Sequence, residues 1–260
     1  MRAQHAATPG ASLALPALWQ SLRMTLRFDR FEVLTFDCYG TLIDWESGIL
    51  AAARRLLSPL GVELDDEAIL ESFARHEHAL EAGPYREYRA ILTDVAQAIG
   101  RELGVEVSGA EAAAFGGSVG DWPAFADSPG ALTRLAGRYR LGVITNCDDD
   151  LFAASARRLG IDFDEVVTAQ QVGSYKPSHH NFEVMFERLG CPRERILHVA
   201  QSLFHDHVPA KALGLTTIWV DRRGGRAGPG ATPAAEAQPD LVVRDLASLA
   251  DLAVGPGGDA

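Results

Sequence analysis

Cysteine is scarce in this chain, which has three, Cys38, Cys147 and Cys191, among 260 residues. They are odd in number and widely spaced, which excludes a disulfide framework and a zinc site built on closely spaced cysteines. We therefore expect a reducing, cytoplasmic location. The ordinary use of such cysteines is as small buried apolar residues, and this is the alternative to any chemical role for Cys38.

Long apolar runs and an excess of positive charge are also lacking. No run approaches the roughly 18 consecutive apolar residues of a membrane-spanning helix. The first 24 residues do not form a secretory signal, and we expect residues 1–24 to be a disordered extension. The formal net charge of −11 excludes a surface built for nucleic-acid phosphates or anionic lipid. A small molecule is the expected partner, with no nucleic acid and no membrane.

Short β-branched runs alternate with helix-like stretches along most of the chain. Runs that are apolar on both faces and separated by helical patterns are typical of buried parallel strands joined by crossover helices. The fold class is therefore predicted to be α/β with a parallel sheet. The expected strands are "VLTF" (33–36), "LGVIT" (141–145), "EVVTA" (165–169), "ILHVA" (196–200), "TTIWV" (216–220) and "DLVV" (240–243).

Residues 47–120 differ, because apolar residues recur there every three to four positions with almost no strand signal. This spacing predicts a helical domain inserted between the first and second strands. We accordingly expect an α/β core from residues 25–46 and 121–255, interrupted by helices over 47–120.

Polar residues directly follow several of the predicted strands. In a parallel sheet these strand ends converge on one crevice, so the side chains should form one site. A carboxylate held by a lysine and hydroxyl donors can act as a nucleophile. Taken singly, each residue also fits an ordinary turn or a solvated loop. The residues are Asp37 with Thr41, Thr145 with Asn146, Lys176, and Ser202 with Asp206.

In their order and spacing these motifs resemble those of the haloacid dehalogenase (HAD) superfamily, over roughly residues 30–255. "DCYGTL" is similar to the first motif, with Asp37 in the place of the nucleophile, and Thr145 ends the second. Lys176 stands in the third, and "AQSLFHD", which ends at Asp206, resembles the fourth. The resemblance implies a Rossmann-like core, with the helical insertion as a cap domain.

Two positions depart from the phosphatases of that superfamily. Tyr39 stands where they carry a second aspartate that protonates the leaving group, and a phenol is a poor acid at neutral pH. Gln201 replaces an aspartate of the fourth motif, and a neutral amide is a weak ligand for magnesium. A D-x-Y-G-T first motif is instead similar to the (S)-2-haloacid dehalogenases, which need no metal and no cofactor. The spacing of the fourth motif remains that of the phosphatases.

This resemblance implies that Asp37 attacks C2 of a small 2-haloalkanoic acid, and that water hydrolyses the resulting aspartyl ester. Thr41, Lys176 and Asp206 would complete the catalytic set. A cap arginine would contact the substrate; Arg75 is the candidate, with Arg86 and Arg89 as rivals and a solvated helix face as the plain alternative. The expected substrate-binding residues are Cys38, Tyr39, Thr145, Asn146, Ser202, Arg75 and Trp45.

Two other functions stay open at this point. One is a magnesium-dependent phosphatase acting on a small phosphomonoester, kept open by Asp206 and the spacing around it. The other is a binding module with the same fold and no catalysis, for which Gln201 would be a sign of lost chemistry. The sequence also leaves open a homodimer.

Overall fold

The computed structural model describes residues 26–224 and 230–257, so the expected extension at 1–24 lies outside the described residues. A six-stranded sheet has the order β3-β2-β1-β4-β5-β6, and all five strand pairs are parallel. The predicted α/β class with a parallel sheet is confirmed. The strands are β1 (Val33–Phe36), β2 (Arg140–Thr145), β3 (Glu165–Thr168), β4 (Ile196–Ala200), β5 (Thr216–Val220) and β6 (Leu241–Val243).

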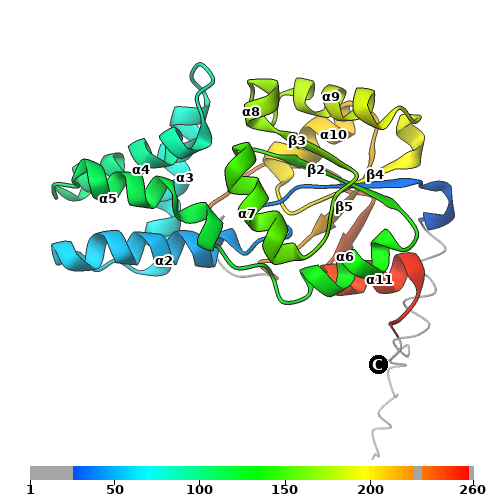
Figure 1. Ribbon diagram of the computed structural model, residues 1–260, viewed down its shortest axis with the longest axis horizontal. Helices are drawn as coiled ribbons and strands as arrows, with labels where there is room; N and C mark the ends of the chain where they lie inside the picture. Colours follow the sequence, from blue (N-terminus) through cyan, green and yellow to red (C-terminus); the bar gives the residue numbers. More distant parts are fainter. Residues whose placement is uncertain (1–25, 225–229, 258–260) are drawn as a thin grey trace, which may run out of the picture.

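Helices cover both faces of the sheet, which explains why its strands are apolar throughout rather than alternating. On one face, Phe182 and Met185 pack against Val33. On the other face, Leu34 packs in a separate core cluster that includes Leu132. The first face is covered by α8 (Ala169–Val172), α9 (His179–Leu189) and α10 (Val208–Ala212), and the second by α6 (Ser128–Ala136), α7 (Asp149–Leu159) and α11 (Leu246–Val254) (Figure 1).

The helices of residues 45–121 stand beside the sheet and do not cover either of its faces, at the left of Figure 1. We call residues 45–121 the helical segment. The chain leaves and re-enters the core at adjacent points: the backbone NH of Asp44 donates to the Pro123 carbonyl over 2.8 Å, and that of Phe125 donates to Leu42 over 3.1 Å. The helical segment holds α2 (Trp45–Leu57), η2 (Ser58–Leu60), α3 (Asp66–Glu81), α4 (Tyr88–Leu103), α5 (Gly109–Gly116) and η3 (Ser118–Asp121).

The chain after β4 does not wind into one regular α-helix. It forms a π-helical turn, η5 (Leu203–His207), followed by α10, which begins at Val208 with Pro209 in its first turn. The Ser202 side chain accepts a hydrogen bond from the backbone NH of His205 and so fixes the start of the turn. This local winding buries the side chain of Asp206. The remaining short helices are η1 (Phe28–Arg30) and η4 (Arg193–Arg195).

Within residues 26–224 and 230–257, none of the helices combines the length and apolar character that crossing a membrane requires.

Candidate active site

The site lies where the strand order reverses, between β1 and β4. Such a switch point opens a crevice at the carboxyl ends of the strands. Asp37 follows β1 directly, and its backbone NH still bonds to the Val199 carbonyl of β4 over 3.1 Å. Gly40 then turns the chain with φ +91°, a region that favours glycine, and a Cβ there would come within 3.0 Å of Gln201 and Trp45. The turn directs the Asp37 side chain into the crevice.

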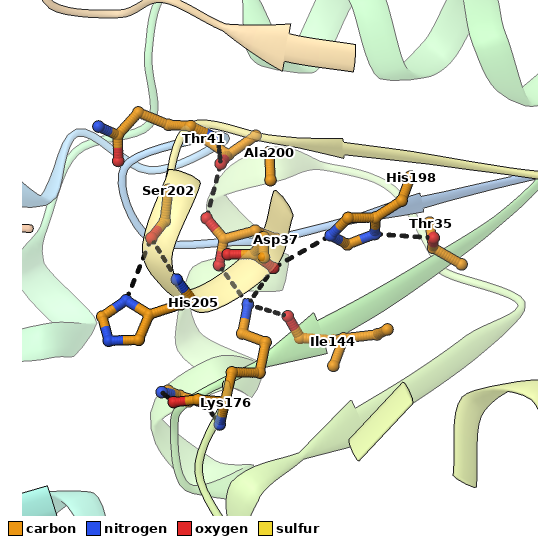
Figure 2. A network of polar contacts seen from close by, with 12 residues as sticks. Thr35, Asp37, Thr41, Ile144, Lys176, His198, Ala200, Ser202 and His205 are labelled. Atoms are coloured by element: carbon orange, nitrogen blue, oxygen red, sulfur yellow. Dashed lines mark hydrogen bonds and ion pairs between the residues drawn. The ribbon is translucent and has the colours of Figure 1, made fainter. Parts of the chain in front are cut away.

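Lys176 joins the two carboxylates of the crevice (Figure 2). Its Nζ donates to Asp37 Oδ1 over 2.9 Å and to Asp206 Oδ1 over 2.7 Å. The third donor of the ammonium goes to the Ile144 carbonyl over 2.9 Å. Because an ammonium has three donors, all of them are used, and Lys176 is fixed in place.

Asn146 holds the loop that carries Lys176. Its Oδ1 accepts from the backbone NH of Lys176 over 2.7 Å, and its Nδ2 donates to the Lys176 carbonyl over 3.1 Å. Two residues predicted from separate loops therefore support each other directly.

Thr41 ties the loop after β1 to the loop after β4. Its hydroxyl donates to Asp37 Oδ2 over 2.6 Å and accepts from the backbone NH of Gln201 over 2.9 Å. With Lys176 on Oδ1 and Thr41 on Oδ2, both oxygens of Asp37 are oriented.

Asp206 is fully buried and is held from the opposite side by a histidine. His198 Nε2 lies 3.0 Å from Asp206 Oδ1, and His198 Nδ1 lies 3.0 Å from the hydroxyl of Thr35 (Figure 2). The ring can donate to the carboxylate while it accepts from the threonine. Asp206 Oδ2 has no hydrogen-bond partner among the described residues.

The electrostatics of these groups follow from burial and from Lys176. Burial raises the pKa of Asp37, and the Lys176 ammonium and the Thr41 hydroxyl oppose that rise. For Asp206 the attraction of Lys176 and the hydrogen bond from His198 outweigh burial, so its pKa lies well below the usual range. Burial lowers the pKa of Lys176, but the two carboxylates overcome this and leave it raised. The ammonium is therefore a permanent charge between two acids.

These residues line a cavity of about 30 Å³. A volume of ~10–15 Å³ holds one water molecule, so the cavity has room for two waters in this closed arrangement. Its wall combines residues of the core and of the helical segment: Asp37, Tyr39, Trp45, Glu77, Glu81, Tyr88, Asn146, Lys176, Ser202, His205, Asp206 and Thr232.

Helix α3 contributes two carboxylates to this wall, Glu77 and Glu81, which lie one helical turn apart. Glu77 is buried, and the Tyr88 hydroxyl donates to its Oε1 over 2.5 Å. Burial raises the pKa of Glu77 to about 7. The pKa of Glu81 is raised well above its ordinary value, first by burial and then by the charge of Glu77.

Of the predicted substrate-binding residues, four line the cavity: Tyr39, Trp45, Asn146 and Ser202. Cys38 and Thr145 are buried but are not part of its wall. The Tyr39 hydroxyl lies 3.0 Å from Ser155 Oγ and accepts from Cys147 Sγ over 3.4 Å, both in the core. Burial raises the pKa of Tyr39 well above 10, so this phenol holds its proton.

The structure does not bring the candidate arginines to the cavity. Arg75 lies on the outer face of α3, 56% exposed, and pairs with Glu102 over 2.6 Å. Arg86 pairs with Asp94 over 2.8 Å, and Arg89 pairs with Asp150 over 2.5 Å. All three lie outside the wall described above. Arg75 therefore lies on a solvated helix face, which was the alternative to substrate contact.

Sequence reasoning missed several residues of the wall and of its support. Glu77 and Glu81 sit in "RHEHALEA", where acidic residues at helical spacing suggest a solvated face. Their spacing of four was the available signal, because it puts both on one side of a helix. Tyr88, Thr232 and the supporting His198 carried no sequence signal.

Magnesium is the metal that the fold family implies, and the residues present do not form a good site for it. Gln201 supplies an amide where the phosphatases of the family have a carboxylate. Among the described residues, no group of three or more His, Cys, Asp or Glu side chains is arranged to hold a metal ion. We derive no step through a metal.

The known proteins that resemble this chain include dehalogenases and phosphatases. An (S)-2-haloacid dehalogenase of Pseudomonas putida is 28% identical over 131 residues, which span 49% of this chain and 55% of that protein. A glyceraldehyde 3-phosphate phosphatase of Methanothermobacter thermautotrophicus is 40% identical over 85 residues, 32% of this chain and 38% of the phosphatase. The chain thus spans about half the length, or less, of these curated relatives.

Among solved structures, an L-2-haloacid dehalogenase from Xanthobacter autotrophicus with chloropropionic acid covalently bound aligns with a TM-score of 0.72 at 21% identity. The alignment covers 86% of this chain and 99% of that chain. This likeness shows the fold. The model of the haloacid dehalogenase-like hydrolases matches residues 31–212, which is more than half of the sequence. With Asp37, Lys176 and Asp206 assembled at the switch point of a parallel sheet, the chain belongs to the haloacid dehalogenase-like hydrolase family.

Proposed function

We propose that this protein hydrolyses the carbon–halogen bond of small 2-haloalkanoic acids through an ester on Asp37. The observation that carries the proposal is that the carboxylate of Asp37 is oriented for attack, while no acid stands two residues later to protonate a leaving group. Asp37 is held on both oxygens, while the position two residues later is a tyrosine that points its hydroxyl into the core. Halide leaves as a stable anion and needs no proton, whereas an alkoxide does.

In the first step a carboxylate oxygen of Asp37 attacks C2 from the side opposite the halogen. The new carbon–oxygen bond forms as the carbon–halogen bond breaks, and halide departs with the bonding electrons. Lys176 and Thr41 fix the direction of the attacking oxygen, which reduces the entropy lost on reaching the transition state. Donors at Ser202 and the backbone amides of Cys38 and Tyr39 would hold the substrate carboxylate.

In the second step water attacks the ester carbonyl of Asp37. Asp206, whose Oδ2 lacks a partner and which lines the cavity, accepts a hydrogen bond from this water and orients it. The bond between the acyl carbon and the substrate oxygen breaks as one proton of the water passes to that oxygen, which gives a 2-hydroxy acid. The second proton of the water leaves Asp37 to solvent, which restores the carboxylate.

We further propose that residues 47–120 act as a cap, because α3 closes over the nucleophile. The reaction as written uses no metal and no cofactor. The three free cysteines, two of them buried, support a reducing cytoplasmic location. A homodimer remains a prediction, for which light scattering of the purified protein is the direct measurement.

The test is halide release from bromoacetate, chloroacetate, fluoroacetate and 2-chloropropanoate, with and without a chelator. We expect release that the chelator leaves unchanged, and a loss of at least ~10³-fold in Asp37→Asn, because the nucleophile is gone. Strong phosphatase activity that the chelator abolishes would replace this proposal with a magnesium-dependent one. Halide release at the wild-type rate from Asp37→Asn would show that Asp37 is not the nucleophile.

A further inference from the structure

The wall of the cavity opposite the core is acidic. The helical segment brings Glu77 and Glu81 to it, and the core adds Asp37 and Asp206. Lys176 also lines it, but its three donors are taken by Asp37, Asp206 and the Ile144 carbonyl. Burial lowers the pKa of His205 to about 4, so that this ring is uncharged at neutral pH. Among the described residues of the wall, no cation is left to receive a second anionic group.

Acceptors are correspondingly abundant. Asp206 is fully buried, and its Oδ2 has no hydrogen-bond partner among the described residues. The Tyr88 hydroxyl holds Glu77 by Oε1 and fixes its carboxyl group against α4. Glu81 lines the same cavity as Asn146, which holds the loop of Lys176. Both glutamates therefore face the cavity, and Glu77 is held there from α4, so they are not a free patch on a helix surface.

A buried acceptor without a donor is costly, and an apolar group against it would leave that cost in place. A second anion there would meet the negative charge of Asp206, whose pKa lies well below the usual range, in a poorly solvated space. A ligand that presents an ammonium or a hydroxyl group removes both penalties. A binding site that accepts a hydrogen bond from its substrate rejects analogues that lack the donor, because the polar groups of the site are then left unpaired.

We propose that Glu77 and Glu81 select 2-haloalkanoic acids whose C3 carries a hydrogen-bond donor, an ammonium or a hydroxyl group. The inference rests on the proposed function for its reaction. The substrate carboxylate and C2 lie toward the core, where Asp37 is, and the C3 substituent faces α3.

The kinetic test compares three substrates of equal size: 3-amino-2-chloropropanoate, 2-chloro-3-hydroxypropanoate and 2-chlorobutanoate. We expect kcat/KM about tenfold to a hundredfold higher for the first two, as hydrogen bonds to a charged group discriminate by that much. Glu77→Gln and Glu81→Gln should each reduce the ratio of kcat/KM for the amine to kcat/KM for 2-chlorobutanoate at least tenfold. Blanks without enzyme and with Asp37→Asn correct for spontaneous ring closure of the first two substrates.

Glu71→Gln is the matched control, because Glu71 lies on the same helix but is exposed. It should leave the preference unchanged. Equal kcat/KM for all three substrates, with the same ratio in the glutamine variants, would overturn the inference and leave the proposed dehalogenation standing.

If no halide release is detected, a binding measurement tests the selection of a C3 donor separately from the proposed dehalogenation. Calorimetric titration of the wild-type protein with 3-aminopropanoate and with butanoate needs no halogen. We expect the amine to bind at least tenfold more tightly, and the difference to vanish in the Glu77→Gln, Glu81→Gln double variant. The same preference with no halide release from any substrate would keep the inference and reject the reaction. Equal or weaker binding of the amine would reject the inference.

Discussion

Lys176 is the residue on which the charges of the site depend. It is buried among Asp37, Asp206 and a backbone carbonyl, at distances of 2.7 to 2.9 Å. Two carboxylates this close in a dry environment are tolerable only while the ammonium lies between them. The same residue therefore stabilises the fold and orients the carboxylate of Asp37.

Replacement of Lys176 by Met should destabilise the protein by about 3–5 kcal/mol, because it leaves two buried carboxylates without their counter-charge. Urea unfolding at pH 7 measures the change. Lys211→Met is the control: Lys211 pairs with Asp240 at the surface with a third of its side chain exposed, and its loss should cost under about 1 kcal/mol. Similar losses in the two variants would contradict the special position of Lys176.

Glu77 is a buried acid whose folded-state pKa is raised, from 4.5 to about 7. The folded state then binds more protons than the unfolded state between these values. The free energy of unfolding therefore falls as pH rises from about 4.5 to about 7 and levels off above that.

The Glu77→Gln variant lacks this titration but keeps an oxygen that can accept from the Tyr88 hydroxyl. Its stability relative to wild type should increase between pH 5 and pH 8, by an amount on the order of 2 kcal/mol. Urea unfolding of both proteins at the two pH values gives the difference directly. A difference that does not change with pH would show that Glu77 ionises as freely in the folded state as in the unfolded state.

At the scale of elements, the base of the helical segment is fixed by the packing of α2 against Trp122, where the chain re-enters the core. Gly48 lies in α2, and a Cβ there would come within 2.2 Å of the Trp122 ring. Trp122 is buried, and its Nε1 donates to Ser118 Oγ over 3.2 Å, so the ring cannot move aside easily. The missing side chain at Gly48 allows the two chain crossings to lie together.

Gly48→Ala should therefore destabilise the protein by about 1–3 kcal/mol through overpacking, despite the better helix propensity of alanine. Gly109→Ala is the matched control, because Gly109 begins α5 and a Cβ there meets no atom within 4 Å. That variant should be neutral or stabilising by up to about 1 kcal/mol. Thermal unfolding of the two variants beside the wild type measures both effects. Equal stability of the two variants would mean that the Trp122 ring moves to make room for the added Cβ.

At the scale of the whole molecule, the site is completed by two parts of the chain that meet over the nucleophile. His78 of α3 contacts Phe204 of η5, with ring centroids 5.5 Å apart. Arg223, in the loop after β5, pairs with Glu46 of α2 over 2.6 Å and with Glu67 of α3 over 2.7 Å. The cavity between them holds about 30 Å³ and is smaller than a haloalkanoic acid, so a molecule of that size can enter only when the parts separate.

Hydrogen exchange should detect this opening. We expect amides of α3 and η5 to exchange faster in the free protein than with saturating 3-aminopropanoate, while the strands of the sheet stay unchanged. Mass spectrometry of peptic fragments reads both regions in one experiment. Calorimetric evidence of binding without any slowing at α3 would mean that this helix does not close over the ligand.

Much of this molecule could be predicted from the sequence because the information is local. Strands β1, β4 and β5 have the predicted bounds, since apolar β-branched runs end abruptly at polar residues. The approach of Asp37, Lys176 and Asp206 was predictable too, because the ends of parallel strands must meet at one edge of the sheet. These features depend on periodicity and on strand order.

The inner face of α3 was decided by the tertiary structure alone. Arg75 and Glu77 stand two positions apart on the same helix, so they face opposite ways, and the helix pattern does not say which face meets the core. The burial of Glu77 depends on the angle at which α3 packs, and that angle is set by distant contacts such as that of His78 with Phe204. The sequence by itself determined which polar residues meet at the ends of the strands, because strand ends are marked locally, and only the packed fold decided which acidic side chains face them.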